Sequence, residues 1–227
     1  MQTINTKYLE EIDQMIEDKN LLKHPFYQAW SRGELSKECL TEYSKQYYHH
    51  VKAFPTYLSA VHMHTECPET RIHLLDNLVE EESRTSSHPK LWRQFIQAFG
   101  LSQEDAENHS AGPAIKKLIS SFRNICQNQG VAEGIAALYA YESQIPDICV
   151  SKIDGLKKVY GMTNPKDWFY FTVHIEADKE HAAVERKLLG QHIDEVNFER
   201  VKLAVEEILD ALWSFLDSLY EEFVMVS

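Results

Sequence analysis

Apolar residues recur along this chain at intervals of three and four, and no other feature constrains the fold as strongly. This spacing puts apolar side chains on one face of a helix, which can then pack against a core. Only eight Gly and seven Pro occur in the 227 residues, too few for the many tight turns of an all-β fold. The sequence therefore predicts an all-α protein. The run that shows the helical spacing most clearly consists of Leu203, Val205, Ile208, Leu209, Leu212, Trp213, Phe215, Leu216 and Leu219.

We expect a bundle of about seven main helices, with one further helix if the N-terminal segment is counted. Two of the helices contain an internal proline, Pro55 and Pro146, and each should bend because proline removes a backbone hydrogen-bond donor. No internal repeat or Gly/Ser-rich linker marks a second domain, so residues 1–227 are expected to form one helical domain. The expected helices span approximately 5–19, 37–65, 68–83, 88–99, 113–127, 131–159, 165–190 and 195–222.

Composition and charge argue against several classes of function. The formal net charge is −12, and the Lys and Arg residues are scattered among acids, so nucleic acid is not an expected partner. The four cysteines lie far apart and form no CxxC pair, which favours reduced thiols over a disulfide framework or a zinc knuckle. The sequence shows no export signal, and no apolar stretch approaches the roughly 20 residues that cross a bilayer. We expect a cytoplasmic protein that does not enter membranes.

A candidate metal site begins in the segment HIEADKEH. His174, Asp178 and His181 stand at positions i, i+4 and i+7 of a predicted helix, which brings the three side chains onto one face. Chains rich in histidine and acids produce such a spacing by chance often enough that it is suggestive only. Its significance depends on whether further ligands are found elsewhere in the chain.

Three further residues complete a plausible ligand set. Glu81 and His88 lie seven residues apart in EESRTSSH, across an expected helix break, and Glu80 or Glu82 would replace Glu81 if the register were shifted. Glu142 lies in the strongly apolar segment ALYAYESQIP, where a buried carboxylate needs a compensating cation or ion-pair partner. Three carboxylates and three imidazoles suit two divalent metals such as iron or manganese. Zinc alone would need fewer ligands.

These residues and the longer runs around them resemble the CADD family, named for chlamydial proteins that associate with death domains. The resemblance spans nearly the whole chain. It implies a haem-oxygenase-like helical bundle, as in PqqC and TenA proteins, and it implies that the six residues are the ligands of a dimetal oxidase without haem. The segments that carry it are HPFYQAW, YSKQYYHHVKAFPTYLSAVH, LLDNL followed by EE and His88, AALYAYESQIP, and FYFTVHIEADKEHA.

The resemblance also implies an activity. CADD-like proteins are associated with the synthesis of para-aminobenzoate for folate, in an oxygen-dependent reaction that consumes a tyrosine of the enzyme and takes nitrogen from a lysine. The matching residues in this chain are Tyr27, Tyr141 and Lys152. The implied cofactors are two irons or a manganese–iron pair, and dioxygen is the implied co-substrate.

Other functions remain open on the sequence. A conventional dimetal oxidase or oxygenase would act on an external small molecule, with Tyr27 and Lys152 only lining its pocket. A cofactorless PqqC-type oxidase or a TenA-type thiamin hydrolase would share the fold but would not need six metal ligands. An interaction protein would bind a host death domain through the acidic surface. A homodimer is expected, because such bundles are commonly dimeric.

Overall fold

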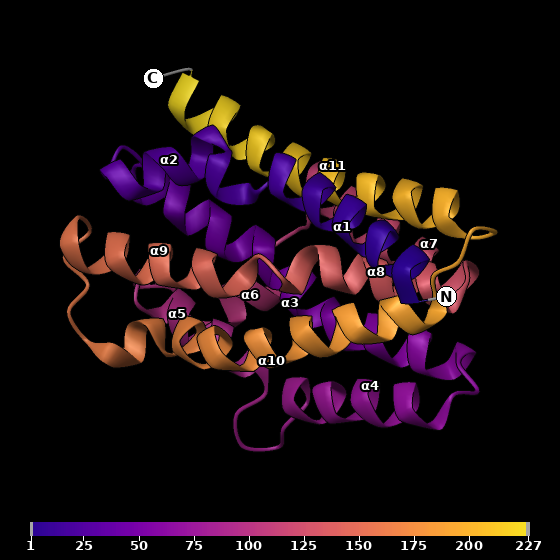
Figure 1. The fold of residues 1–227 in the computed structure, drawn as a ribbon. Coiled ribbons are helices and arrows are strands. Elements are labelled where there is room, and N and C mark those ends of the chain that lie inside the picture. The colour runs from indigo at the N-terminus through magenta and orange to yellow at the C-terminus, as the bar shows by residue number, and fades with distance from the viewer. Residues whose placement is uncertain (1, 226–227) are drawn as a thin grey trace.

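The computed structural model describes residues 2–225, with side chains from residue 5 onward, and within this range it contains helices and no strand. The all-α prediction is confirmed. Short 3-10 turns cover Leu21–Lys23 and Pro165–Trp168, and a π-helical turn covers Glu221–Met225. The α-helices, labelled in Figure 1, are α1 Gln2–Asp18, α2 Pro25–Arg32, α3 Lys37–His64, α4 Pro68–Glu81, α5 His88–Gln97, α6 Gln103–Asn108, α7 Pro113–Asn128, α8 Val131–Glu142, α9 Ile145–Lys158, α10 Phe169–His192 and α11 Phe198–Tyr220.

The structure has more helices than the sequence predicts. The short helices α2 and α6 were not expected, because neither is long enough to show a clear apolar repeat. The single bent helix predicted over 131–159 is wrong, since α8 ends at Glu142 and α9 begins at Ile145. Pro146 stands in the first turn of α9, where its missing N–H group would have had no helical partner in any case. Pro55 does lie inside α3, as predicted.

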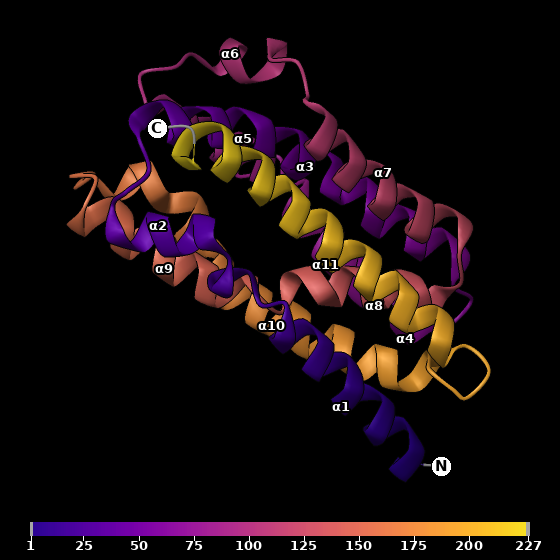
Figure 2. The ribbon, with the colours of Figure 1, turned by 90° about the horizontal axis from the view of Figure 1, so that it is seen from above.

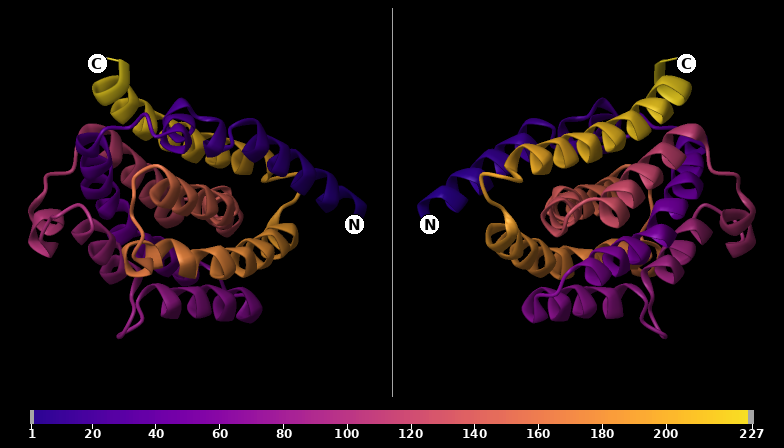
Figure 3. Two further views of the ribbon diagram at one scale, coloured as in Figure 1. Left: turned by 90° about the vertical axis from the view of Figure 1, so that its left-hand side faces the viewer. Right: turned by 90° about the vertical axis from the view of Figure 1, so that its right-hand side faces the viewer.

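Helices α8 and α9 pass through the middle of the bundle (Figures 1 and 3). Helix α8 contacts α3, α7, α10 and α11, and Figure 2 shows α11 crossing above it. Every residue from Ala132 to Glu142 is buried, as expected for a helix that is apolar on all its faces. The fold therefore carries the Glu142 carboxylate into the core. None of the helices described here is long and apolar enough to cross a membrane.

Helix α9 is held against α2 by a close contact between Gly155 and Trp30. A Cβ atom at Gly155 would lie 2.6 Å from Cδ1 of the Trp30 ring, so only glycine allows the two helices to approach this closely. The Trp30 Nε1 group also donates a hydrogen bond of 3.3 Å to the carbonyl oxygen of Lys152. This contact fixes the turn of α9 that carries the Lys152 side chain.

The Gly155→Val substitution is expected to lower the free energy of unfolding by about 1 to 3 kcal/mol, because the added methyl groups must displace the buried Trp30 ring. Urea denaturation followed by circular dichroism measures the change. The control is Asp154→Val on the exposed side of the same helix, which should change stability by no more than about 0.5 kcal/mol. An equal loss in the two variants would show that the Gly155 contact is not tight.

Candidate metal centre

Two of the six predicted ligands lie at the C-terminal ends of helices. Glu81 is the last residue of α4 and Glu142 is the last residue of α8, and their exposed fractions are 4% and 1%. The C-terminal end of a helix carries a partial negative charge, which destabilises a carboxylate at that position. Burial adds a further desolvation cost for an ionised group. Both carboxylates are therefore in places where a nearby cation would be strongly favoured.

Glu81, His88 and His174 form one group of potential ligands, and their donor atoms lie within 4.8 Å of one another. His88 Nδ1 lies 2.8 Å from Glu81 Oε1, yet this buried nitrogen takes part in no hydrogen bond among the described residues. His174 Nδ1 donates to the carbonyl oxygen of Tyr170 over 2.6 Å, which leaves Nε2 as the free lone pair. A backbone carbonyl that fixes the tautomer in this way is typical of metal-binding histidines.

Glu142, Asp178 and His181 form a second group, also within 4.8 Å. His181 Nδ1 lies 3.5 Å from Glu142 Oε1 and 3.4 Å from Asp178 Oδ1, and it has no hydrogen-bond partner among the described residues. Asn77 Nδ2 donates to both oxygens of Glu142, over 3.1 and 3.3 Å. This amide holds the Glu142 carboxylate in place from the side of α4.

The structure thus brings all six predicted residues together, in two groups of three. His174 belongs to the first group, whereas Asp178 and His181 belong to the second, because α10 runs past both groups. Glu80 and Glu82, the alternatives considered for Glu81, are exposed and belong to neither group.

The electrostatics of the second group favour a cation. Burial, reinforced by the charge of Glu142, raises the pKa of Asp178 to about 7. Burial alone would lower the pKa of His181, but the carboxylates of Asp178 and Glu142 outweigh it and raise that pKa to about 11. Burial and the neighbouring Glu142 also raise the pKa of Glu185 well above its usual range. Carboxyl groups crowded into one small volume retain protons that a divalent cation would replace.

The histidines of the first group differ in charge. Burial and the nearby His88 lower the pKa of His174 well below its usual value, so its imidazole is neutral, the form that binds metals. Burial opposes protonation of His88 too, but the Glu81 carboxylate prevails and raises that pKa. The donor set of buried imidazoles and carboxylates fits a pair of divalent transition metals. Between the groups lies a cavity of about 10 Å³, lined by Val51, Phe54, Glu81, Tyr141, Glu142, Tyr170, His174 and Asp178.

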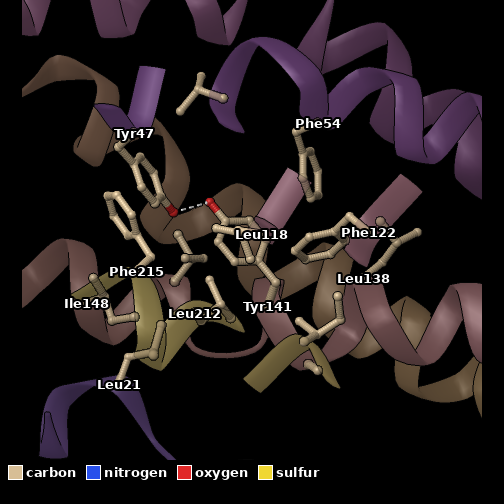
Figure 4. Packing of buried hydrophobic residues seen from close by; sticks show 14 of the residues in the cluster. Leu21, Tyr47, Phe54, Leu118, Phe122, Leu138, Tyr141, Ile148, Leu212 and Phe215 are labelled. Atoms are coloured by element: carbon tan, nitrogen blue, oxygen red, sulfur yellow. Dashed lines mark hydrogen bonds between the residues drawn. The ribbon is translucent and has the colours of Figure 1, made fainter. Parts of the chain in front are cut away.

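A row of four buried tyrosines leads away from this centre. The hydroxyl groups of Tyr141 and Tyr47 are 2.7 Å apart, and Figure 4 shows them pointing toward each other. The Tyr47 ring stacks on Tyr43, with ring centroids 5.4 Å apart and 20° between the planes. The Tyr43 hydroxyl then lies 3.5 Å from that of Tyr27 and accepts a hydrogen bond of 2.5 Å from Lys152 Nζ. The row connects Tyr141, beside the metal ligands, with Tyr27 and Lys152.

Lys152 is buried among aromatic rings, with an exposed fraction of 3%. Its Nζ atom lies 5.4 Å from the centre of the Tyr27 ring, so the structure places these two predicted residues together. The other rings within 6 Å of Nζ belong to Trp30, Tyr43, Tyr47, Trp92 and Phe171.

Several residues of this site were not predicted from the sequence. Tyr43 and Tyr47 are among them, although their spacing of four residues places both on one helical face. Asn77 precedes Glu81 by four residues, and Glu185 follows His181 by four, so each shares the helical face of a predicted ligand. A spacing of four residues could therefore have indicated the Tyr43 and Tyr47 pair, Asn77 and Glu185 from the sequence.

Comparisons with known proteins identify the family of this chain. A family model described as "Iron-containing redox enzyme" matches residues 41–213. A protein of Chlamydia pneumoniae named 4-aminobenzoate synthase is 44% identical over 213 residues, which cover 94% of this chain and 95% of the relative. A protein of Nitrosomonas europaea with the same name is 39% identical over 226 residues, which cover 95% and 92%.

Solved structures with low sequence identity share the fold. A TenA homologue from Pseudomonas syringae pv. tomato superposes with a TM-score of 0.83 at 16% identity, over 96% of this chain and 93% of the other. A CADD-like protein of unknown function from Nostoc punctiforme gives 0.75 at 18%, over 95% and 99%. The chain belongs to the family of iron-containing redox enzymes with the haem-oxygenase-like helical fold, and within it to the CADD group.

Proposed function

We propose that this protein is a 4-aminobenzoate synthase that makes its product from its own Tyr27 and Lys152, with dioxygen and a pair of metals, two irons or manganese with iron. The observation that carries the proposal is the contact between Lys152 and Tyr27, connected through Tyr43 and Tyr47 to Tyr141 beside the candidate metal ligands. The names of the relatives from Chlamydia and Nitrosomonas support 4-aminobenzoate as the product.

The proposed metal ligands are Glu81, His88 and His174 for one ion and Glu142, Asp178 and His181 for the other. When bound, the two reduced metals supply the electrons that activate dioxygen. Other protein groups orient these ligands. His174 keeps its free nitrogen directed by the bond to the Tyr170 carbonyl, and Asn77 holds Glu142 in position.

The tyrosine row provides a route for oxidising Tyr27. Burial raises the pKa of Tyr43, Tyr47 and Tyr141 well above the usual value, so all three are neutral phenols. A neutral phenol gives up an electron most easily when its proton can pass to a neighbour at the same time. The hydroxyl contacts of Tyr141 with Tyr47 and of Tyr43 with Tyr27 provide such neighbours.

The product matches the residues at the far end of the row. In 4-aminobenzoate a carboxyl carbon stands para to an amine, and in tyrosine Cβ stands para to the hydroxyl. The ring and Cβ of Tyr27 thus contain the carbon skeleton of the product, provided that the Cα–Cβ bond breaks, dioxygen oxidises Cβ to a carboxyl group, and an amine replaces the phenolic oxygen. The nitrogen must come from another group, whose own bond from carbon to nitrogen breaks. Lys152 Nζ is the amine that faces this ring.

Lys152 is suited to donate nitrogen. Burial lowers its pKa to about 7, so near neutral pH a large fraction of the amine is uncharged and has the lone pair that amine transfer requires.

A reaction on an external aromatic substrate is less well supported. The cavity between the two ligand groups has a volume of about 10 Å³, too small to hold an aromatic substrate between the two proposed metals. A substrate built from the protein's own side chains needs no such pocket.

The Glu81→Gln and Glu142→Gln variants are expected to bind fewer metal ions than the wild type, which should bind about two per chain. Each substitution removes an anionic ligand from one of the two groups. Metal analysis after reconstitution with Fe²⁺ or Mn²⁺ measures the stoichiometry. The matched control is Glu82→Gln, because Glu82 is exposed and lies in neither group. Full metal content in both ligand variants would contradict the assignment.

The wild type, loaded with metal, reduced and exposed to oxygen, is expected to release 4-aminobenzoate and to lose the matching side-chain mass. Tyr27→Phe and Lys152→Arg should yield no product from that source and should keep their mass, because the oxidisable phenol or the transferable amine is absent. Intact-protein mass spectrometry measures both effects. The control is Tyr139→Phe, a buried tyrosine bonded to Asp13 outside the row. Metal binding without any mass change would point instead to an external substrate.

The depressed pKa of Lys152 predicts a pH-dependent stability difference from Lys152→Met. The folded pKa, about 7, is below the unfolded value of 10.5, so between these values the unfolded state binds more protons. The destabilisation caused by Lys152 is therefore full at pH 7 and below, and it shrinks by up to about 1.4 kcal/mol per pH unit as the pH rises toward 10.5. Urea denaturation of the metal-free wild type and of Lys152→Met at pH 7 and pH 9.5 measures this stability difference.

The control for this experiment is Lys166→Met, because Lys166 is exposed and lies outside the aromatic rings that surround Lys152. A constant difference for Lys152→Met would mean that Lys152 stays charged in the folded protein.

A further inference from the structure

A pocket of about 500 Å³ lies between α4 and α10, which run side by side at one edge of the bundle (Figure 1). The two helices are joined across the pocket's flanks by polar contacts. Near the start of α4, Glu69 forms an ion pair of 2.7 Å with Lys187, and near its end Glu80 Oε2 lies 3.3 Å from His181 Nε2. Because His181 is a proposed metal ligand, the pocket reaches from the solvent to the second ligand group.

The lining of the pocket is acidic. Among the residues that the structure describes, no lysine or arginine lines it. Asp76 and Glu180 are exposed and form no ion pair with any described residue, so their charges remain uncompensated. A concave surface with charges of one sign concentrates counter-ions. The ionisable side chains of the lining are His73, Asp76, Glu80, Glu180, His181 and Glu185.

Acidic clusters are common on protein surfaces, but the inner wall of this pocket adds a second observation. Asn77 and Glu185 are buried, with exposed fractions of 4% and 3%. The Asn77 Oδ1 atom accepts no hydrogen bond from any described residue, and the partner of the Glu185 carboxyl group is the carboxyl group of Glu142. Buried oxygens rarely lack a donor, and oxygen atoms of amides and carboxylates are ligands for divalent cations. Asn77 is also the residue whose amide nitrogen contacts Glu142.

We propose that this pocket captures a divalent transition-metal cation from solvent and delivers it to Glu142, Asp178 and His181. Asp76, Glu80 and Glu180 attract the ion at the mouth. Asn77 Oδ1 and Glu185 receive it at the inner wall, one contact away from Glu142. The inference rests on the proposed metal centre and adds the path by which that centre is loaded.

The charge of the lining disfavours the opposite use of the pocket. An aromatic carboxylate such as 4-aminobenzoate would meet carboxyl groups on both walls and no lysine or arginine among the described lining residues. The pocket is therefore a poor exit for that product and a good entrance for a cation.

The test compares how fast metal-free proteins take up Mn²⁺. A triple variant, Asp76→Asn, Glu80→Gln and Glu180→Gln, removes the charges at the mouth and keeps all six proposed ligands, and the amide introduced at position 80 retains an oxygen that can accept a hydrogen bond from His181 Nε2. The matched control, Glu10→Gln, Glu104→Gln and Glu206→Gln, changes the net charge equally at exposed positions that do not line the pocket. Stopped-flow mixing with a fluorescent chelator that reports free Mn²⁺ gives the uptake rate, and metal analysis gives the final content.

The triple variant is expected to load about tenfold more slowly than the wild type at low ionic strength, with the difference shrinking as salt is added. Its final Mn²⁺ content should equal that of the wild type, and the control should load at the wild-type rate. Equal rates in the triple variant and the control, with full metal content in both, would overturn the entry path and leave the metal centre standing. A wild type that binds no Mn²⁺ or Fe²⁺ would refute the metal centre and the path together.

Discussion

The rest of the structure depends on the need to neutralise carboxylates buried at helix ends. Glu81 and Glu142 terminate α4 and α8 where the helix dipoles add to their negative charge, and Asp178 faces them from α10. Isolated charges of this kind cost several kcal/mol each inside a protein. The three helices can converge only if cations, or protons in their place, accompany them. The packing of these helices therefore requires positive charge next to the carboxylates, and the lysine and arginine side chains that the structure describes do not provide it.

The end of α8 at Glu142 also separates two chemical environments. Before the break, α8 places the Glu142 carboxylate in the polar centre. After the break, α9 places Lys152 among aromatic rings. In one continuous helix, Glu142 and Lys152 would be held in a fixed position relative to each other. The turn at residues 143–144 and Pro146 allows each half to pack on its own partners, with Gly155 bringing α9 against α2. The tyrosine row crosses the space between the two environments.

Much of this could be predicted from the sequence, and what could not has identifiable causes. Long helices and the shared face of His174 and Asp178 follow from periodicity, which is a local property. The division of these two residues between separate ligand groups depends on how α10 crosses α4 and α8, which no spacing encodes. The interruption after Glu142 was read as a bend, because a proline shortly after it permits either a kink or a new first turn. The role of Tyr43 depends on its contact with Lys152, which lies more than 100 residues away in the sequence and which only the fold brings close.

The burial of Tyr27 has a consequence for the life of each molecule. Its ring is 3% exposed and packs against Phe26, Trp30 and Tyr43. Under the proposed chemistry, one turnover removes that ring and leaves a void in the core, a loss of about 3 to 5 kcal/mol by analogy with truncation of buried aromatics. The free energy of unfolding of a domain is only about 5 to 15 kcal/mol. A spent molecule would thus lose a large part of its stability and would be degraded faster by cellular proteases. Because each molecule reacts once, supply of the product would follow the rate of protein synthesis.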